Sequence, residues 1–86
     1  MRSGEKNSLG RSAYARKMGH RLYELRKDRD LSQEQVAHEA GISTYTYQKY
    51  EKGESRPGTP MNPCLFTLVA LSEVFEVDIT ALFDFE

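Results

Sequence analysis

Several features that would place this chain in other protein classes are scarce or missing. Cys64 is the single cysteine, so the sequence has neither an intrachain disulfide nor a cysteine-based zinc site. The longest uncharged apolar run, residues 64–72, is far shorter than the roughly 18 residues that cross a membrane. The first residues contain no apolar segment of the kind found in secretory signal peptides. We therefore expect a cytoplasmic protein that does not enter the membrane.

Motifs for catalysis are missing as well. The sequence has no glycine-rich phosphate loop, no nucleophile elbow and no cluster of metal ligands. His20 and His38 lack a matching ligand spacing, and the acidic residues near the C-terminus are spread out rather than paired for acid–base chemistry. We expect no catalytic residue, no metal, no cofactor and no small-molecule ligand.

Basic residues are missing from the last third of the chain. Residues 59–86 carry five acidic groups and no basic one, whereas residues 1–29 carry nine basic groups and three acidic ones. The net charge of −1 for the whole chain hides this separation. A chain divided in this way can present one positive face to a polyanion. A solvated helix face followed by an acidic tail explains the same charges, so charge alone leaves both interpretations open.

The 86 residues do contain a succession of helix signals, enough for one domain. Met18, Leu22 and Leu25 recur at helical spacing, which predicts a helix over residues 13–29 after a flexible basic arm over residues 1–11. Residues 54–63 contain three prolines, which predict a loop. We expect an all-α domain of five helices over residues 12–86. Its four later helices are bounded by Ser32 and Gly41, by Ser43 and Gly53, by Asn62 and Phe75, and by Asp78 and the C-terminus.

Residues 31–53 hold the most informative pattern. Two capped helices joined by a short turn at Gly41 are typical of a helix-turn-helix motif. Tyr47 and Tyr50 are three residues apart, so they share the buried face of the second helix, residues 44–52. The opposite face carries side chains that can hydrogen-bond and stack, as the reading of base edges in a major groove requires: Thr44, Tyr45, Gln48 and Lys49.

Further motifs extend this pattern over residues 17–83: Leu25-Arg26, Leu31-Ser32-Gln33-Glu34, Gly41-Ile42-Ser43, Tyr50-Glu51-Lys52-Gly53 and Val77-Asp78-Ile79. With them the chain resembles the Xre-type, phage lambda repressor-like helix-turn-helix family, although its loop after Gly53 is longer than usual. The resemblance implies that Gln33 binds a DNA phosphate and that Arg26 and Glu51 form a structural ion pair. It also implies base contacts from Thr44, Tyr45 and Lys49, with Gln48 beside them. We expect further phosphate contacts from Ser43, Lys52 and the arm residues Arg2, Lys6 and Arg11.

Taken together, these observations predict a transcriptional regulator, a repressor, that binds double-stranded DNA in a sequence-specific manner. Its helix over residues 44–52 is expected to lie in the major groove. We also expect a homodimer through the fifth helix and the C-terminal tail, because Phe85 is hard to bury in one small domain. The alternative is a protein-interaction module on the same fold, an antitoxin or adaptor with weak or no DNA binding. The near-zero net charge and the apolar Phe66 favour that alternative.

Overall fold

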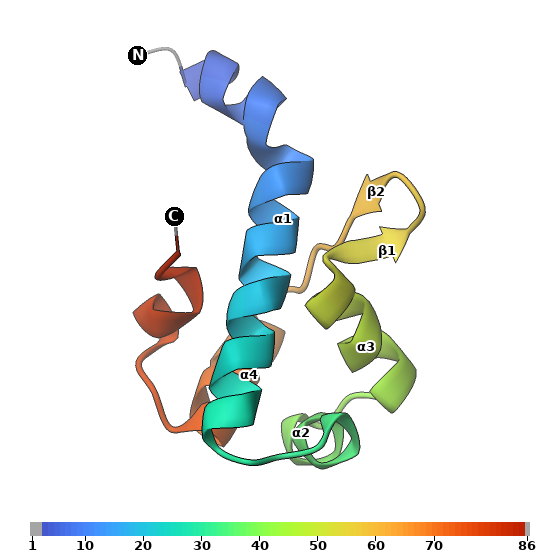
Figure 1. Cartoon of the computed structure of the whole chain (residues 1–86), viewed down its shortest axis with the longest axis vertical. Coiled ribbons are helices and arrows are strands. Elements are labelled where there is room, and N and C mark those ends of the chain that lie inside the picture. The colour runs from blue at the N-terminus through green and yellow to red at the C-terminus, as the bar shows by residue number, and fades with distance from the viewer. Residues whose placement is uncertain (1–2, 86) are drawn as a thin grey trace.

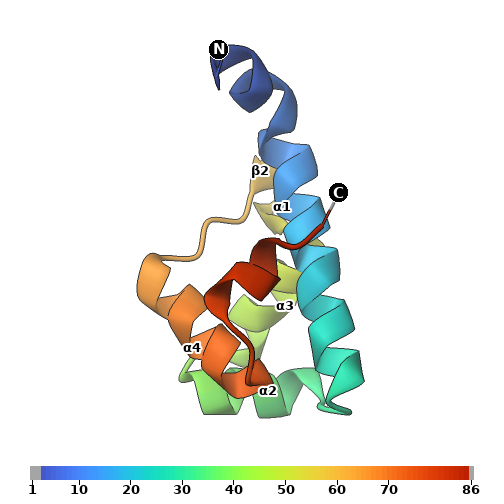
Figure 2. The ribbon, with the colours of Figure 1, turned by 90° about the vertical axis from the view of Figure 1, so that its left-hand side faces the viewer.

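The fold is mostly helical over residues 3–85, which a computed structural model describes, with side chains described from residue 10 onward. Figure 1 shows α1 along the length of the molecule, with α3 and two short strands on one side and η1 with the C-terminus on the other. In the view of Figure 2, α4 packs against α2 and η1. The elements in chain order are α1 (Ser3–Asp28), α2 (Gln33–Ala40), α3 (Thr44–Lys52), β1 (Glu54–Arg56), β2 (Thr59–Pro60), α4 (Leu65–Phe75) and the 3₁₀ helix η1 (Ile79–Phe83).

The first helix begins earlier than predicted. α1 starts at Ser3, so the predicted start at Ala13 is wrong, and the helix continues through residue 11, where a boundary between arm and domain is expected. The sequence before residue 12 gave no helical periodicity, because it has few large apolar residues. Its two glycines also favour a helix only weakly. The division of the chain into an arm and a domain stays a prediction.

Hydrogen bonds at the helix ends define the helix-turn-helix motif. The Ser32 hydroxyl accepts a hydrogen bond from the Gln35 amide at 3.0 Å, and the Gln35 side chain accepts one from the Ser32 amide at 2.7 Å. Gly41 ends α2 in the left-handed conformation, with φ of 77°. The Ser43 hydroxyl caps α3 by accepting from the Thr46 amide at 3.0 Å. These predicted boundaries are confirmed.

The predicted loop after α3 contains a small hairpin instead. β1 and β2 pair antiparallel, with Glu54 opposite Pro60 and Arg56 opposite Thr59. The turn is Pro57-Gly58, and φ of 82° at Gly58 fits the third position of a type II turn. Strands of three and two residues are too short for an alternating pattern, and a proline is tolerated in an edge strand. For these reasons the sequence predicted a loop here.

The last two helices differ from prediction at their ends. α4 begins at Leu65 after Cys64, later than the predicted cap at Asn62, and it ends at Phe75 as predicted. Asp78 caps the next turn, since its carboxylate accepts from the Thr80 amide at 3.0 Å. That turn is the 3₁₀ helix η1 and not a fifth α-helix, so residues 3–85 form four α-helices and a hairpin. A segment this short cannot complete enough i to i−4 hydrogen bonds for a stable α-helix.

One hydrophobic core joins α1, the helix-turn-helix motif, α4 and η1. The predicted stripe of α1 is buried in it, and Tyr14 on the rim of α1 holds Phe85 in an edge-to-face contact at 4.9 Å between ring centroids. Phe85 thus packs within its own chain. The fully buried large side chains are Tyr47, Phe75, Leu22, Leu71, Leu82 and Val36.

Candidate nucleic-acid interface

The close packing of α3 on α1 determines which face of α3 is exposed. Gly19 of α1 lies so near the α3 backbone that an added Cβ would stand 2.5 Å from the Glu51 carbonyl oxygen. Tyr47 is fully buried and Tyr50 packs half-buried against the core, as their spacing predicted. Helical geometry then turns the opposite side of α3 outward, whereas Glu51 near its end faces α1.

The outward face of α3 presents the predicted base-reading residues to solvent. Tyr45 is 67% exposed and Gln48 is exposed, while Thr44 and Lys49 are partly exposed. The Lys49 ammonium lies 4.4 Å from the centre of the Tyr45 ring, within the range of a cation–π interaction. Sequence reasoning chose both residues but missed this contact, although their separation by four residues on one helix was a signal for it.

An ion pair joins α1 to the end of α3. Arg26 donates to the two carboxylate oxygens of Glu51, from Nε at 2.6 Å and from the terminal guanidinium at 3.1 Å. Its third hydrogen bond, 3.0 Å to the Leu31 carbonyl, holds the start of the segment that leads to α2. The side chains are only 12% and 9% exposed. The ion pair predicted for Arg26 and Glu51 is thus present and mostly shielded from water.

The environment of Glu51 favours its charged form. Burial alone would raise the pKa of Glu51, but hydrogen bonds from Arg26 and Gln33 and the nearby Tyr47 lower it below its usual value. The hydrogen bond with Glu51 raises the pKa of Arg26 in turn, against the opposing effect of burial. Both groups are therefore charged over the physiological pH range.

Gln33 at the start of α2 lies between the ion pair and the exposed face of α3. Its amide nitrogen donates to Glu51 at 3.0 Å, and its amide oxygen accepts from the Gln48 side chain at 3.3 Å. These two bonds fix the orientation of the amide and leave one of its N–H groups without a hydrogen-bond partner among residues 10–85. The link between Gln33 and Gln48 was not predicted, because it depends on how α2 and α3 cross.

Tyr47 lies beneath this polar network. Its hydroxyl is buried and has no hydrogen-bond partner within residues 10–85. Burial raises the pKa of Tyr47, and the nearby carboxylate of Glu51 adds to the increase. Tyr47 is therefore neutral and contributes through packing.

The predicted phosphate-binding residues are only partly brought together. Gln33 and Ser43 lie at the N-termini of α2 and α3, and Lys52 is exposed in the last turn of α3. The Ser43 hydroxyl is already engaged at the helix cap. It accepts a hydrogen bond from the Thr46 amide and donates one to the Thr46 hydroxyl at 2.9 Å. Arg11 is exposed on α1, whereas Arg2 and the side chain of Lys6 lie outside the described residues.

The described part of the chain contains neither a metal-binding cluster nor a membrane-spanning helix. No group of three or more His, Cys, Asp or Glu side chains there is arranged to hold a metal ion. None of its helices combines the length and apolar character needed to cross a membrane.

Comparisons with known proteins agree with this geometry. Residues 22–82 match the helix-turn-helix family. The cryptic phage CTXphi transcriptional repressor RstR of Vibrio cholerae is 37% identical over 62 residues, which cover 72% of this chain and 50% of RstR. The chain thus spans about half the length of that curated relative.

Solved structures show the same fold. The restriction-modification controller protein C.AhdI of Aeromonas hydrophila superposes with a TM-score of 0.73 and 30% identity, covering 83% of this chain and 98% of that one. SinR of Bacillus subtilis, a master regulator for biofilm formation solved in complex with DNA, superposes with a TM-score of 0.66 and 25% identity, covering 78% and 98%. The chain therefore belongs to the helix-turn-helix family, in its Xre-type, lambda repressor-like branch.

Proposed function

We propose that this chain is a transcriptional regulator, a repressor, that binds double-stranded DNA sequence-specifically with α3 in the major groove. The observation that carries the proposal is the exposed polar face of α3, which is held on a rigid support by the Arg26–Glu51 pair and the buried Tyr47. A repressor among its relatives and a DNA complex among similar structures support it. The proposed site of action is the cytoplasm.

The base-reading role belongs to Thr44, Tyr45, Gln48 and Lys49. A lysine suits guanine, whose O6 and N7 are both acceptors, and the Tyr45 ring beside it limits the directions in which Lys49 can extend. Gln48 gives one N–H to Gln33 and keeps its amide oxygen and its other N–H for a base. The four residues thus form one prearranged reading surface.

The phosphate-binding role belongs to Gln33, Ser43 and Lys52, together with Arg2, Lys6 and Arg11. The orientation of Gln33 leaves one N–H that can donate to a phosphate oxygen beside the N-terminus of α2. Ser43 would bring the phosphate to the N-terminus of α3 through the backbone there, because its own hydroxyl is engaged in the cap. Contacts of this kind fix the register of the protein on DNA without reading sequence.

The test is selection of binding sites from a random duplex pool, followed by affinity measurements on the selected site. Lys49→Ala should weaken specific binding by about 1–3 kcal/mol and relax the preference at one base position. Lys17→Ala, which removes the same charge from α1, is the matched control and should leave that preference intact. If Lys49→Ala changed neither affinity nor preference, the base-reading assignment would be wrong.

A second candidate function is a protein-interaction module, the alternative left open by the sequence. The specific observation in its favour is Phe66 at the start of α4, which is 78% exposed. A salt titration separates the two functions, because binding through several phosphates weakens steeply as salt rises. Negligible DNA binding at low salt, beside a tight protein complex, would favour this second candidate.

The proposed regulator acts as a homodimer through η1 and the C-terminal tail. Phe83 supports this surface, because it stays 40% exposed while the neighbouring Leu82 is fully buried. Phe85 does not support it, because Phe85 already packs against Tyr14. A twofold dimer suits a palindromic site, since each half-site would meet one α3.

A further inference from the structure

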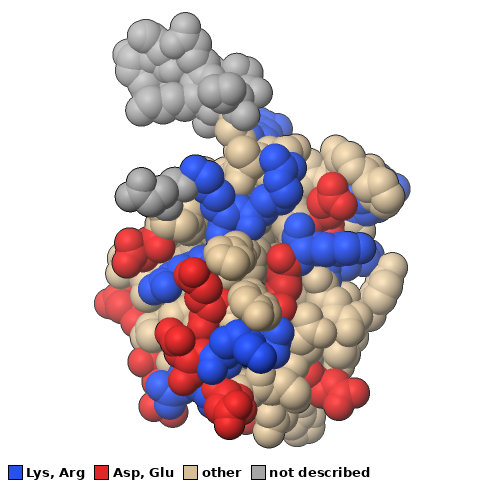
Figure 3. All heavy atoms as spheres, viewed as in Figure 1, with Lys and Arg blue, Asp and Glu red and all other residues tan. Residues whose placement is uncertain are grey.

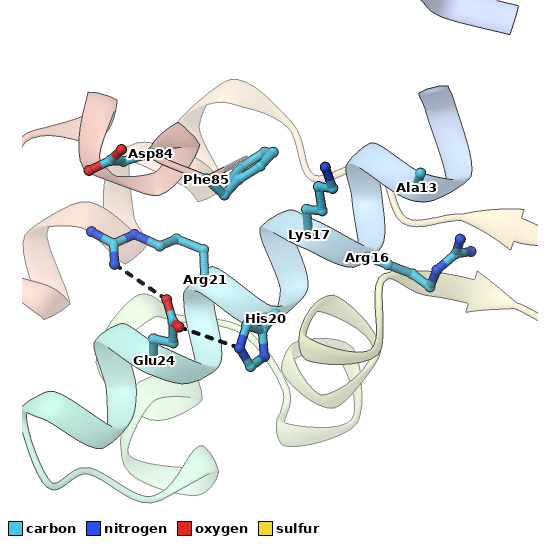
Figure 4. Close-up of a pocket in the computed structure, with 8 residues that line it drawn as sticks. All are labelled: Ala13, Arg16, Lys17, His20, Arg21, Glu24, Asp84 and Phe85. Carbon is cyan, nitrogen blue, oxygen red and sulfur yellow. Dashed lines mark hydrogen bonds and ion pairs between the residues drawn. The ribbon is translucent and has the colours of Figure 1, made fainter. Parts of the chain in front are cut away.

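A groove runs between α1 and the C-terminal tail that follows η1. It has a volume of about 570 Å³ and is lined by six residues of α1, from Ala13 to Glu24, and by Asp84 and Phe85 of the tail (Figure 4). Binding sites for small molecules have volumes of roughly 300–1,000 Å³. None of the residues proposed to read bases lines the groove. The groove is therefore large enough for a small ligand and separate from the proposed reading surface.

Side-chain contacts hold the two walls of this groove together. The Arg21 Nε donates to the Ala81 carbonyl of η1 at 2.8 Å, which joins α1 to the element before the tail. At a second point, the Phe85 ring packs edge-to-face against Tyr14 of α1, with 4.9 Å between the ring centroids. The walls are thus in place before a ligand arrives, so binding requires little additional ordering of the chain.

Most charged groups of the groove already have partners. The Glu24 carboxylate lies 3.4 Å from the His20 imidazole and 3.5 Å from the Arg21 guanidinium. Lys17 differs from these three, because its ammonium group takes part in no salt bridge and no side-chain hydrogen bond among residues 10–85. The ammonium of Lys17 is therefore available to an external anion.

Lys17 and Phe85 place this positive charge beside an apolar surface. Figure 4 shows both side chains on the same side of α1, with the Asp84 carboxylate on the far side of Phe85 from Lys17. Arg16 extends toward the strands instead. The Phe85 ring is half-buried, and the Ala13 methyl group and the hydrocarbon stem of Lys17 enlarge the apolar surface. The groove thus combines an apolar wall with one available cation.

We propose that this α1–tail groove binds a small organic acid that carries a flat apolar group. Its carboxylate pairs with the Lys17 ammonium, and its apolar group packs against the Phe85 ring. In Figure 3, Lys and Arg side chains gather over the upper part of α1, which favours an anion over a cation as the ligand. The sequence gave no reason to expect a small-molecule ligand, because the two walls come from opposite ends of the chain. The proposal is independent of the function proposed above.

The test uses 2-naphthoate as the probe and the whole chain as the protein. Titration followed by amide chemical shifts should give saturable changes at Lys17, Arg21 and Phe85. Two matched compounds separate the contributions, since 2-naphthamide has the rings without the charge and acetate has the charge without the rings. Each should bind at least about fivefold more weakly than 2-naphthoate. Because 2-naphthoate contacts only the folded chain, it should also raise the Tm.

Lys17→Met tests the cation directly. The substitution keeps most of the hydrocarbon stem and removes the ammonium group, and Lys17 is exposed, so the fold should be unaffected. The variant should bind 2-naphthoate about fivefold more weakly than wild type and 2-naphthamide equally well. Lys27→Met is the matched control, because it removes an exposed lysine of the same helix outside the groove. It should bind both compounds as wild type does.

The outcomes are distinguishable. If 2-naphthoate causes no saturable changes at the groove, or if Lys17→Met binds it as tightly as wild type, this inference is overturned. If 2-naphthamide binds as tightly as 2-naphthoate, the carboxylate is not recognised and the inference is overturned as well. Binding of the selected duplex is measured in parallel on the wild-type chain. Duplex binding without 2-naphthoate binding overturns this inference alone, and the reverse result supports it while overturning the proposed function.

Discussion

Glu51 is the residue on which three elements depend. It accepts hydrogen bonds from Arg26 of α1 and from Gln33 of α2, while it is itself part of α3. Removing one partner of a largely buried ion pair leaves the other charge without compensation, which costs on the order of 3–5 kcal/mol. The same carboxylate therefore stabilises the fold and orients the Gln33 amide for its proposed phosphate.

The pH dependence of stability tests this role. The pKa of Glu51 is lower in the folded chain than its usual value, so the carboxylate contributes stability above the unfolded pKa of about 4.3. That contribution is lost as the pH falls through the folded pKa. Glu51→Gln should be less stable than wild type by about 3 kcal/mol at pH 7, and the difference should shrink below pH 4.3. Urea unfolding at several pH values measures it, and a constant difference down to pH 3 would contradict the assignment.

Individual side chains were predictable where their place depends on one helix. A spacing of three residues was enough to bury Tyr47 and Tyr50 and to expose Tyr45, because helical geometry alone decides which residues share a face. The bonds from Gln33 to Gln48 and to Glu51 were not predictable from spacing, since they depend on the crossing of separate helices. The Arg26–Glu51 pair was expected only from the family resemblance.

At the scale of elements, the crossing of α1 and α3 depends on a residue without a side chain. Gly19 lets the helices approach until an added Cβ would stand 2.5 Å from the Glu51 carbonyl oxygen and 2.7 Å from that of Tyr50. Both obstacles are backbone atoms, so they cannot rotate away. The close approach is what brings Arg26 within reach of Glu51 and fixes the tilt of the reading face.

Gly19→Ala should therefore destabilise the fold by about 1–3 kcal/mol, although alanine is the better helix former. Gly10→Ala is the control on the same helix, because the added methyl group meets no described atom within 4 Å beyond its own stretch of helix. It should leave stability unchanged or raise it by up to about 1 kcal/mol. Thermal and urea unfolding of both variants measure the difference. Equal stability of the two would show that α1 and α3 have room to separate.

The helix boundaries were predictable from the sequence where a capping residue or a glycine at the boundary sets them. Ser32, Ser43 and Asp78 cap their helices as expected, and Gly41 and Gly53 take the left-handed conformation that ends α2 and α3. The hairpin was not predicted because tertiary contacts stabilise its pairing. Met61 is anchored in the core, and Gly53 packs against α1. Tertiary contacts of this kind leave no periodic signal in two strands of three and two residues.

For the whole molecule, the separation of charge along the chain becomes a separation in space. The basic half supplies α1, and the acidic last third supplies α4, which packs on α2 and η1, and also η1 and the tail, which lie on the other side of α1 from the hairpin. An acidic surface facing away from DNA avoids repulsion by phosphates and keeps the basic side turned toward the duplex. The low net charge of the chain is thus compatible with the proposed DNA binding, because the proposed reading face is on α3 while η1 and the acidic tail lie on the other side of α1.

The proposed homodimer can be tested by measuring the mass of the protein in solution. Light scattering should give the wild-type protein twice the mass of one 9.9 kDa chain. Phe83→Ala should shift the measured mass toward that of the monomer. Phe83 is exposed while Leu82 beneath it is buried, so the substitution removes a surface contact and leaves the core intact. Phe66→Ala, which truncates an exposed phenylalanine on α4, is the control and should remain dimeric.

The spacing of half-sites in the selected DNA tests the proposed dimer independently. Two copies of α3 related by a twofold axis would select half-sites about one helical turn apart, roughly 34 Å. Phe83→Ala should then bind a single half-site as wild type does and lose the gain in affinity from the second one. A wild-type chain that stays monomeric at every concentration, or a selected site without repeated halves, would contradict the dimer. The reading face of α3 would be unaffected by that result, because its exposure depends on Gly19, Tyr47 and the Arg26–Glu51 pair within one chain.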